Sequence, residues 1–210
     1  MIFIIVPKKI ILASKSAARK SIFANLGINA EIYITDADEE LEEELSPEEI
    51  VRELSLRKAR IAKEQIGDPN ILIIAADTVV EYDGKIIGKP KDAEDAARTL
   101  SMLSGNFHRV YSGITIILGS FEACDHDVTK VKFRDMDIRE IEQYIKIGDP
   151  LTKAGAYGAE GPGAAFIEHI EGDFFNIAGL PIFKFANMLK TSFGLTVFDL
   201  PTQDLPERSR

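Results

Sequence analysis

One carboxylate stands inside a hydrophobic segment of this chain. Asp77 follows the apolar residues 71–76 and precedes Thr78, Val79 and Val80. Short, continuous runs rich in β-branched residues predict a buried strand. A buried carboxylate is costly unless it is paired, hydrogen-bonded or bound to a metal, so Asp77 needs a partner. Asp77 is therefore a candidate for acid–base or metal chemistry. The alternative is an Asp that ends the strand and caps a loop.

Hydroxyl and cationic side chains gather where the first predicted strand meets the first predicted helix. Ser14 and Ser16 lie between the strand 10–13 and the helix 17–26, which carries Arg19. A helix N-terminus offers free N–H groups and the positive end of the helix dipole, so it readily binds phosphate. The glycines of a Walker loop are absent. The segment predicts a phosphate cradle, and the alternative is an ordinary Ser N-cap with solvated cations.

Carboxylates crowd residues 36–49, and Glu39 follows a predicted strand at 30–34. Mg²⁺ prefers carboxylates together with substrate phosphate oxygens, and loops that follow strands commonly carry site residues. Glu39 is therefore a candidate metal ligand, although a solvated acidic face is the default interpretation. Lys58 lies within the next predicted helix, where exposure to solvent is expected.

Two further segments predict the walls of a binding cleft. Lys89 stands between Gly88 and Pro90, and the proline restricts the backbone from which the lysine projects. Residues 153–165 are rich in glycine, which indicates close backbone approaches, and residues 173–181 form a loop before the last helix.

The elements that position these residues alternate along the chain. Strands are predicted at 10–13, 30–34, 71–80, 110–118, 128–133 and 164–170, with a hairpin turn at 82–85. Helices are predicted at 17–26, 46–66, 92–103, 137–147 and 181–191. The order βαβα, followed by a strand-rich middle, predicts an α/β fold with a mixed sheet.

Composition narrows the class of protein. The 210 residues suit one large domain or two lobes around one cleft. The net charge of −9 argues against a nucleic-acid binder, although a local basic pocket can still hold an anion. The apolar N-terminal residues 1–6 are too few for a membrane span, so a cytoplasmic protein without a membrane partner is expected. Cys124 is the single cysteine, which excludes an intrachain disulfide, and residues 202–210 are expected to form a flexible tail.

The chain resembles the Maf family of nucleoside triphosphate pyrophosphatases from about residue 10 to about residue 193. Several motifs carry the resemblance in order: Leu12-Ala13-Ser14-x-Ser16, Ala76-Asp77-Thr78-Val79-Val80, Gly88-Lys89-Pro90, Leu103-Ser104-Gly105 with His108, Lys153-Ala154-Gly155-Ala156-Tyr157-Gly158 and Gly179-Leu180-Pro181. Each motif is weak by itself, and together they are highly specific.

The resemblance implies a fold like that of inosine triphosphatases, in which a mixed twisted sheet has flanking helices and two lobes surround a long cleft. Residues 1–201 are expected to form this single domain. It implies hydrolysis of nucleoside triphosphates to monophosphate and pyrophosphate with Mg²⁺ or Mn²⁺, and it suggests a homodimer. Asp77 matches the family's proton acceptor. The phosphate- and metal-site positions are matched by Ser14, Arg19, Glu39, Lys58 and Lys89. Whether Asp77 acts as a base or as a metal ligand beside Glu39 stays open.

The positions that select the base disagree with one another. Ala18 stands where the family carries Arg in its dTTP/UTP branch and Trp in its 7-methyl-GTP branch. Thr78 resembles the dTTP/UTP branch, whereas Glu160 resembles the methyl-GTP branch. We therefore expect a broad base preference, with Glu160 supplying what selectivity there is. A nucleotide-binding regulator of cell division without turnover is the alternative function.

Overall fold

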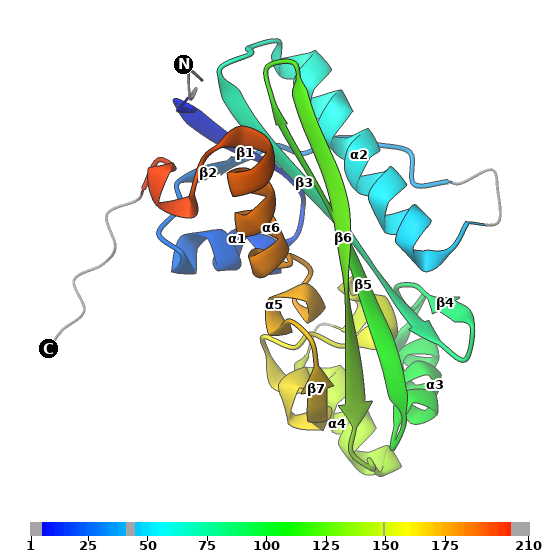
Figure 1. The fold of residues 1–210 in the computed structure, drawn as a ribbon. Coiled ribbons are helices and arrows are strands. Elements are labelled where there is room, and N and C mark those ends of the chain that lie inside the picture. The colour runs from blue at the N-terminus through cyan, green and yellow to red at the C-terminus, as the bar shows by residue number, and fades with distance from the viewer. Residues whose placement is uncertain (1–5, 41–44, 149, 203–210) are drawn as a thin grey trace, which may run out of the picture.

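The computed structural model describes residues 6–40, 45–148 and 150–202. Within these residues a seven-stranded mixed sheet forms the centre of the fold (Figure 1). Its strands are β1 (Lys9–Ala13), β2 (Ala30–Ile32), β3 (Ile71–Tyr82), β4 (Lys85–Ile87), β5 (Phe107–Leu118), β6 (Phe121–Phe133) and β7 (Ile167–Glu171). β2, β1 and β3 are parallel, and β5, β6 and β7 continue the sheet in antiparallel pairs. The predicted α/β fold with a mixed sheet is confirmed.

Helices cover both faces of this sheet. They are α1 (Ala17–Asn25), α2 (Pro47–Ile66), α3 (Ala93–Leu103), α4 (Ile138–Ile147), α5 (Phe174–Ile177) and α6 (Ile182–Met188). Figure 1 shows α2 on one side of the long strands and α1 with α6 on the other. The start of α2 is fixed by a capping box, in which Ser46 and Glu49 each bond the other's backbone N–H, and its end by Gly67 in the left-handed conformation. Among the described residues, no helix is both long enough and apolar enough to span a bilayer.

Alternation along β3 assigns its side chains to two different cores. Leu72 and Ile74 pack among buried residues of α1 and α6. Ile73 and Ala75 point to the other face and pack against α2. Because successive strand residues face opposite sides, Asp77 continues the series that faces α2. The position of Asp77 in β3 therefore determines which helix can supply its partner.

Several predicted boundaries are wrong for identifiable reasons. β6 begins at Phe121 rather than at residue 128, because an antiparallel strand with a solvated face accommodates the charged residues 122–127 that resemble a loop. Residues 162–166 form the 3₁₀ turn η3, so the last strand begins at Ile167 rather than at residue 164. β2 ends two residues earlier than predicted, at Ile32, and β5 begins three residues earlier, at Phe107.

The loops of the second half of the chain also contain short helical turns. The predicted loop 173–181 contains α5, and the final helix α6 ends at Met188, where the π-helical turn η4 (Leu189–Phe193) follows. The hairpin at 82–85 is confirmed, since Asp83 and Gly84 both have positive φ angles, as a two-residue type I′ turn requires. Thr202, predicted to begin the tail, bridges to Ile28, and the rest of that tail lies outside the described residues.

A second core lies where α3 and α4 pack against β5 and β6. His108 is buried beside this core, and its Nε2 lies 2.8 Å from the hydroxyl oxygen of Tyr157. The imidazole also packs edge-on against Phe133, with the ring centroids 4.8 Å apart. Burial lowers the pKa of His108 to about 4, from an ordinary value of 6.5. His108 is therefore neutral at pH 7 and joins the motif containing Tyr157 to the sheet.

Acidification should destabilise the protein through His108. The pKa in the unfolded chain is higher, so the unfolded chain takes up the proton first as the pH falls. The stabilisation that comes from keeping His108 neutral in the folded protein is complete above pH 6.5 and is lost as the pH falls through about 4. Between pH 7 and pH 4 the free energy of unfolding should fall by about 3 kcal/mol more in the natural protein than in a His108→Gln variant. Urea unfolding at both pH values measures the difference, and equal falls would contradict a buried neutral imidazole.

Candidate functional site

A cleft of about 830 Å³ is lined by residues of β1, α1, α2, β3 and β5 and of the loops that connect the elements. Its lining includes every residue that the sequence predicted for the site: Ser14, Ser16, Arg19, Glu39, Lys58, Asp77, Thr78, Lys89 and Glu160. Ala18, the position that departs from the family pattern, lines the same cleft. The structure thus brings together residues from α1, α2, β3 and four loops.

The cleft forms where β1 separates from β3. The last pair between these parallel strands is Ala13 with Ala75, after which β1 turns toward α1 and β3 continues to Tyr82. Ligands of open α/β sheets bind beyond the carboxyl ends of such strands. Asp77 lies two residues past the last pair, inside β3, so the alternative of a strand-end cap is wrong.

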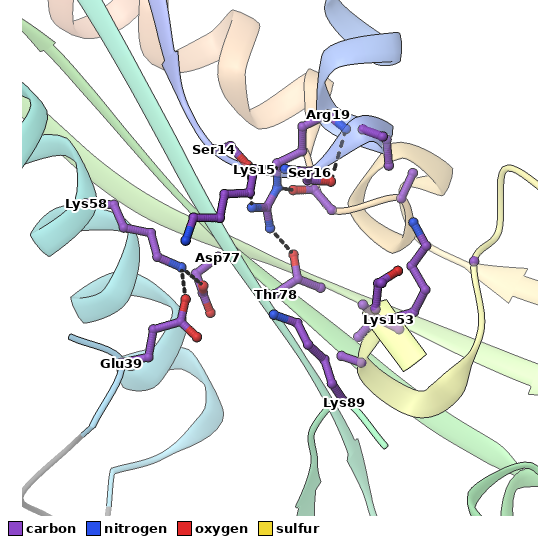
Figure 2. A pocket seen from close by; sticks show the side chains of 18 of the residues that line it. Ser14, Lys15, Ser16, Arg19, Glu39, Lys58, Asp77, Thr78, Lys89 and Lys153 are labelled. Carbon is purple, nitrogen blue, oxygen red and sulfur yellow. Dashed lines mark hydrogen bonds and ion pairs between the residues drawn. The ribbon is translucent and has the colours of Figure 1, made fainter. Parts of the chain in front are cut away.

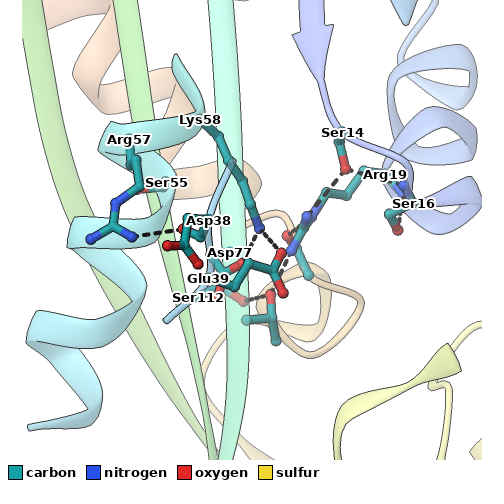
Figure 3. A network of polar contacts seen from close by, with 12 residues as sticks. Ser14, Ser16, Arg19, Asp38, Glu39, Ser55, Arg57, Lys58, Asp77 and Ser112 are labelled. Atoms are coloured by element: carbon teal, nitrogen blue, oxygen red, sulfur yellow. Dashed lines mark hydrogen bonds and ion pairs between the residues drawn. The ribbon is translucent and has the colours of Figure 1, made fainter. Parts of the chain in front are cut away.

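The partner that Asp77 requires is Lys58. The ammonium nitrogen Nζ of Lys58 lies 2.6 Å from Oδ1 of Asp77 and 2.7 Å from Oε1 of Glu39 (Figure 3). The side chains of Lys58 and Asp77 are only 13% and 12% exposed, so the expectation of a solvated Lys58 is wrong. The hydrogen bond from Lys58 is the main cause that lowers the pKa of Glu39 below its ordinary value. One ammonium and two carboxylates, each from a different segment of the chain, therefore form one cluster.

Close packing of α2 on the sheet positions Lys58. Asp77 pairs across the sheet with Gly113, and a β-carbon at Gly113 would lie 2.0 Å from the carbonyl oxygen of Val51 in α2. Val51 and Lys58 are two helical turns apart, so they lie near the same face of α2. The absence of a side chain at Gly113 allows α2 to approach the sheet closely enough for Lys58 to reach Asp77.

Arg19 connects three parts of the cleft wall. Its Nε donates to the carbonyl of Gly179 at 2.7 Å, its Nη1 to Ser14 at 3.2 Å and its Nη2 to Thr78 at 2.9 Å. Burial lowers the pKa of Arg19 from its ordinary value, and the negative charge of Asp77 opposes that effect. Three of the five guanidinium N–H groups are used in these bonds, which leaves two that can meet an anionic ligand.

The hydroxyl of Ser16 caps α1, accepting a hydrogen bond from the backbone N–H of Arg19 at 3.4 Å. Ser14 accepts from the backbone N–H of Ser16 at 3.1 Å. The N-cap interpretation of Ser16 is therefore correct, and its contact with phosphate stays a prediction. Lys15 also lines the cleft, so the start of α1 presents hydroxyl, backbone and ammonium donors to one space.

Lys89 and Glu160 also line the cleft. Pro90 is buried, so it anchors the backbone from which the exposed Lys89 projects (Figure 2). Desolvation raises the pKa of Glu160, and the positive charge of Lys153 acts in the opposite direction. Lys153 lines the cleft and rests its side-chain carbons beside Gly158.

The sequence prediction omitted two components of this site. Lys153 was quoted only as part of a motif, although a lysine directly before a glycine-rich cleft wall is a usable signal. Ser112 links the site to the sheet, because its hydroxyl lies 2.8 Å from that of Thr78 and donates to the carbonyl of Asn176 at 2.9 Å. Nothing in the sequence around Ser112 indicates this contact.

The donors present fit a hard divalent cation. Within the described residues no group of three His, Cys, Asp or Glu side chains could hold a metal, but two carboxylates, Glu39 and Asp77, already meet at one cation, the ammonium of Lys58. Mg²⁺ is commonly bound by one or two carboxylates together with substrate phosphates and water. The pair is therefore sufficient if a phosphorylated ligand supplies the other oxygens.

Comparison with known proteins identifies close sequence relatives. The profile of a family described as "Maf-like protein" matches residues 9–192. A dTTP/UTP pyrophosphatase of Alkaliphilus oremlandii is 41% identical over 192 residues, which cover 90% of this chain and 99% of that protein. A dTTP/UTP pyrophosphatase of Bacillus pumilus is 40% identical over 190 residues, with the same coverage of both chains.

Among solved structures, the Ham1 protein of Staphylococcus aureus aligns with 76% of this chain and 80% of its own, at 16% sequence identity and a TM-score of 0.45.

Proposed function

The chain belongs to the Maf-like protein family, and from this premise and the cleft we propose that it hydrolyses nucleoside triphosphates to nucleoside monophosphate and pyrophosphate. The observation that carries the proposal is the cluster of Asp77, Lys58 and Glu39 inside a cleft lined with further cations. A carboxylate beside cationic groups suits attack of water on a phosphoanhydride, because a base and charge stabilisation are then adjacent.

The charges in the cleft favour a substrate that arrives with a metal. Five cations face five carboxylates among the lining residues: Lys15, Arg19, Lys58, Lys89 and Lys153 against Asp36, Asp38, Glu39, Asp77 and Glu160. A balanced cleft in a protein of net charge −9 does not neutralise a triphosphate alone. We propose that Glu39 and Asp77 would hold Mg²⁺ or Mn²⁺, which supplies Lewis-acid stabilisation of the phosphate charge when bound.

In the proposed reaction, a water oxygen bonds to the α-phosphorus, and the bond from that phosphorus to the bridging oxygen of the β-phosphate breaks. Asp77 takes the proton that the water loses. In the nucleotide-free protein, Lys58 engages Oδ1 of Asp77, whereas Oδ2 has no hydrogen-bond partner within the described residues, so a carboxylate oxygen can accept this proton. The departing pyrophosphate gains charge, which Arg19 and Lys89 stabilise. The phosphate chain rests near Ser14 and Ser16.

We propose dTTP and UTP as substrates, because the relatives carry that name. Glu160 is compatible with this choice, since an ionised carboxylate accepts from the N3–H of thymine or uracil as well as from the N1–H of guanine. Ala18 provides only a small apolar surface, and such a surface discriminates between ligands by about 1–3 kcal/mol. The broad base range expected from the sequence therefore stays a prediction, with dTTP and UTP placed first.

Pyrophosphate release from dTTP, UTP, CTP, GTP and ATP tests this function. We expect release with dTTP and UTP, and we expect a Glu160→Gln variant to rank the five nucleotides differently, because an amide both donates and accepts. Glu168→Gln on β7, which lies outside the cleft lining, is the matched control and should keep the natural ranking. Nucleotide binding without any release would favour the regulator without turnover. An unchanged ranking in Glu160→Gln would remove Glu160 from base selection.

A further inference from the structure

The ammonium of Lys58 occupies the point at which the two candidate metal ligands meet. Nζ contacts Asp77 at 2.6 Å and Glu39 at 2.7 Å, through one oxygen of each carboxylate. Figure 2 shows Lys58 reaching from α2 to both carboxylates, while Lys89 approaches from the loop after β4 and forms no ion pair with either. Lys58 is therefore the resident counter-ion of the pair, which distinguishes it from the other cations of the cleft.

A divalent metal and this ammonium exclude one another at the same oxygens. Mg²⁺ binds carboxylate oxygens at about 2.0–2.1 Å, so a metal on these oxygens would lie within about 5 Å of Nζ. Two cations at that separation repel strongly in a partly buried site. The metal can bind the two oxygens that Lys58 holds, Oδ1 of Asp77 and Oε1 of Glu39, only after the ammonium has moved away.

We propose that Lys58 blocks the metal site of the nucleotide-free protein by binding both carboxylates. A triphosphate frees the site, because its phosphate oxygens replace the carboxylates as partners of the Lys58 ammonium. Lysine suits this exchange because its ammonium is a compact charge on a flexible stem of four carbons. Without a nucleotide, nothing compensates Lys58 for the loss of two ion pairs, so free metal binds weakly. With a triphosphate, the metal takes the carboxylates and Lys58 takes the phosphate. This inference rests on the proposed function for its ligand, a metal–triphosphate.

The test measures Mn²⁺ binding to the nucleotide-free protein, by the paramagnetic resonance signal of free Mn²⁺, which disappears on binding. Lys58→Met keeps the length of the stem and removes the charge. We expect it to bind Mn²⁺ at least about tenfold more tightly than the natural protein, because the carboxylates lose their competitor. Lys89→Met removes one positive charge from the same cleft without touching the carboxylates. As the matched control, it should tighten binding by less than about threefold.

Two further variants make the result decisive. Adding Asp77→Asn to Lys58→Met should abolish the gain, which assigns the bound Mn²⁺ to this carboxylate pair. If Lys58→Met does not fold, as judged by circular dichroism, Lys58→Gln replaces it, since its amide can bond both carboxylates without a charge. Equal affinities in the natural protein and the Lys58 variant would overturn the proposal, as would an equal gain in Lys89→Met. The measurement needs no turnover, so absent pyrophosphate release would refute the proposed function and leave the Mn²⁺ result to be judged separately.

Discussion

Replacing Asp77 with Asn is expected to reduce pyrophosphate release by about 10²–10⁴-fold, the usual contribution of a positioned general base. The amide has nearly the same shape as the carboxylate, so the change removes the charge and the proton-accepting oxygen without creating a cavity. Lys58 keeps Glu39 as a partner at 2.7 Å, so the cluster retains one ion pair. We therefore expect the unfolding temperature, and nucleotide binding measured without a divalent metal, to change little while turnover collapses.

Asp125 provides the matched control for this experiment. It also lies on a strand of the sheet, β6, and pairs with a lysine, Lys184, at 3.0 Å, but it does not line the cleft. Asp125→Asn should therefore keep near-natural turnover while it loses an ion pair with lysine, in this case a more exposed one. Turnover in Asp77→Asn within a few-fold of the natural protein would end the role of Asp77 as the proton acceptor. A similar collapse in both variants would show that losing an ion pair within the sheet is enough to stop the reaction.

The fold follows from local signals that agree with one another. Ser46, Glu49 and Gly67 specify both ends of α2, and the apolar run before Asp77 specifies β3. These signals depend only on residues close in sequence, which is why they can be read without a structure. The strand boundaries of β6 are different, because its charged half is recognisable as a strand only once β5 lies beside it.

The site was predicted as a set of residues and not as a set of contacts. The motifs indicated which side chains face a ligand, and all of them line one cleft. The partner of Asp77 was not predictable in the same way, because Lys58 is separated from it by a helix end, a loop and half a strand. Only the packing of α2 on the sheet brings them together. Because a lysine on a helix is usually exposed to solvent, the sequence did not indicate the ion pair between Lys58 and Asp77.

Gly113→Ala is expected to damage stability and catalysis together. The added β-carbon would lie 2.0 Å from the carbonyl oxygen of Val51, and this neighbour is helix backbone that cannot rotate away. The helix α2 must retreat from the sheet, which loosens its buried contacts at Ala59 and Ala62. Overpacking of this kind costs about 1–3 kcal/mol in the free energy of unfolding. Urea unfolding at pH 7 measures the loss.

The same retreat should separate Lys58 from Asp77, since both depend on the distance between α2 and the strand pair β3–β5. A displacement of about 1 Å in a catalytic group can lower the rate by about 10²-fold, so kcat should fall even at temperatures where Gly113→Ala is fully folded. Gly161→Ala is the control: no atom lies within 4 Å of the added β-carbon, so the change should be nearly neutral for stability. A Gly113→Ala protein as stable and active as the natural one would contradict the close packing of α2. A loss of stability with unchanged kcat in the folded variant would show that the Lys58–Asp77 contact does not depend on that packing.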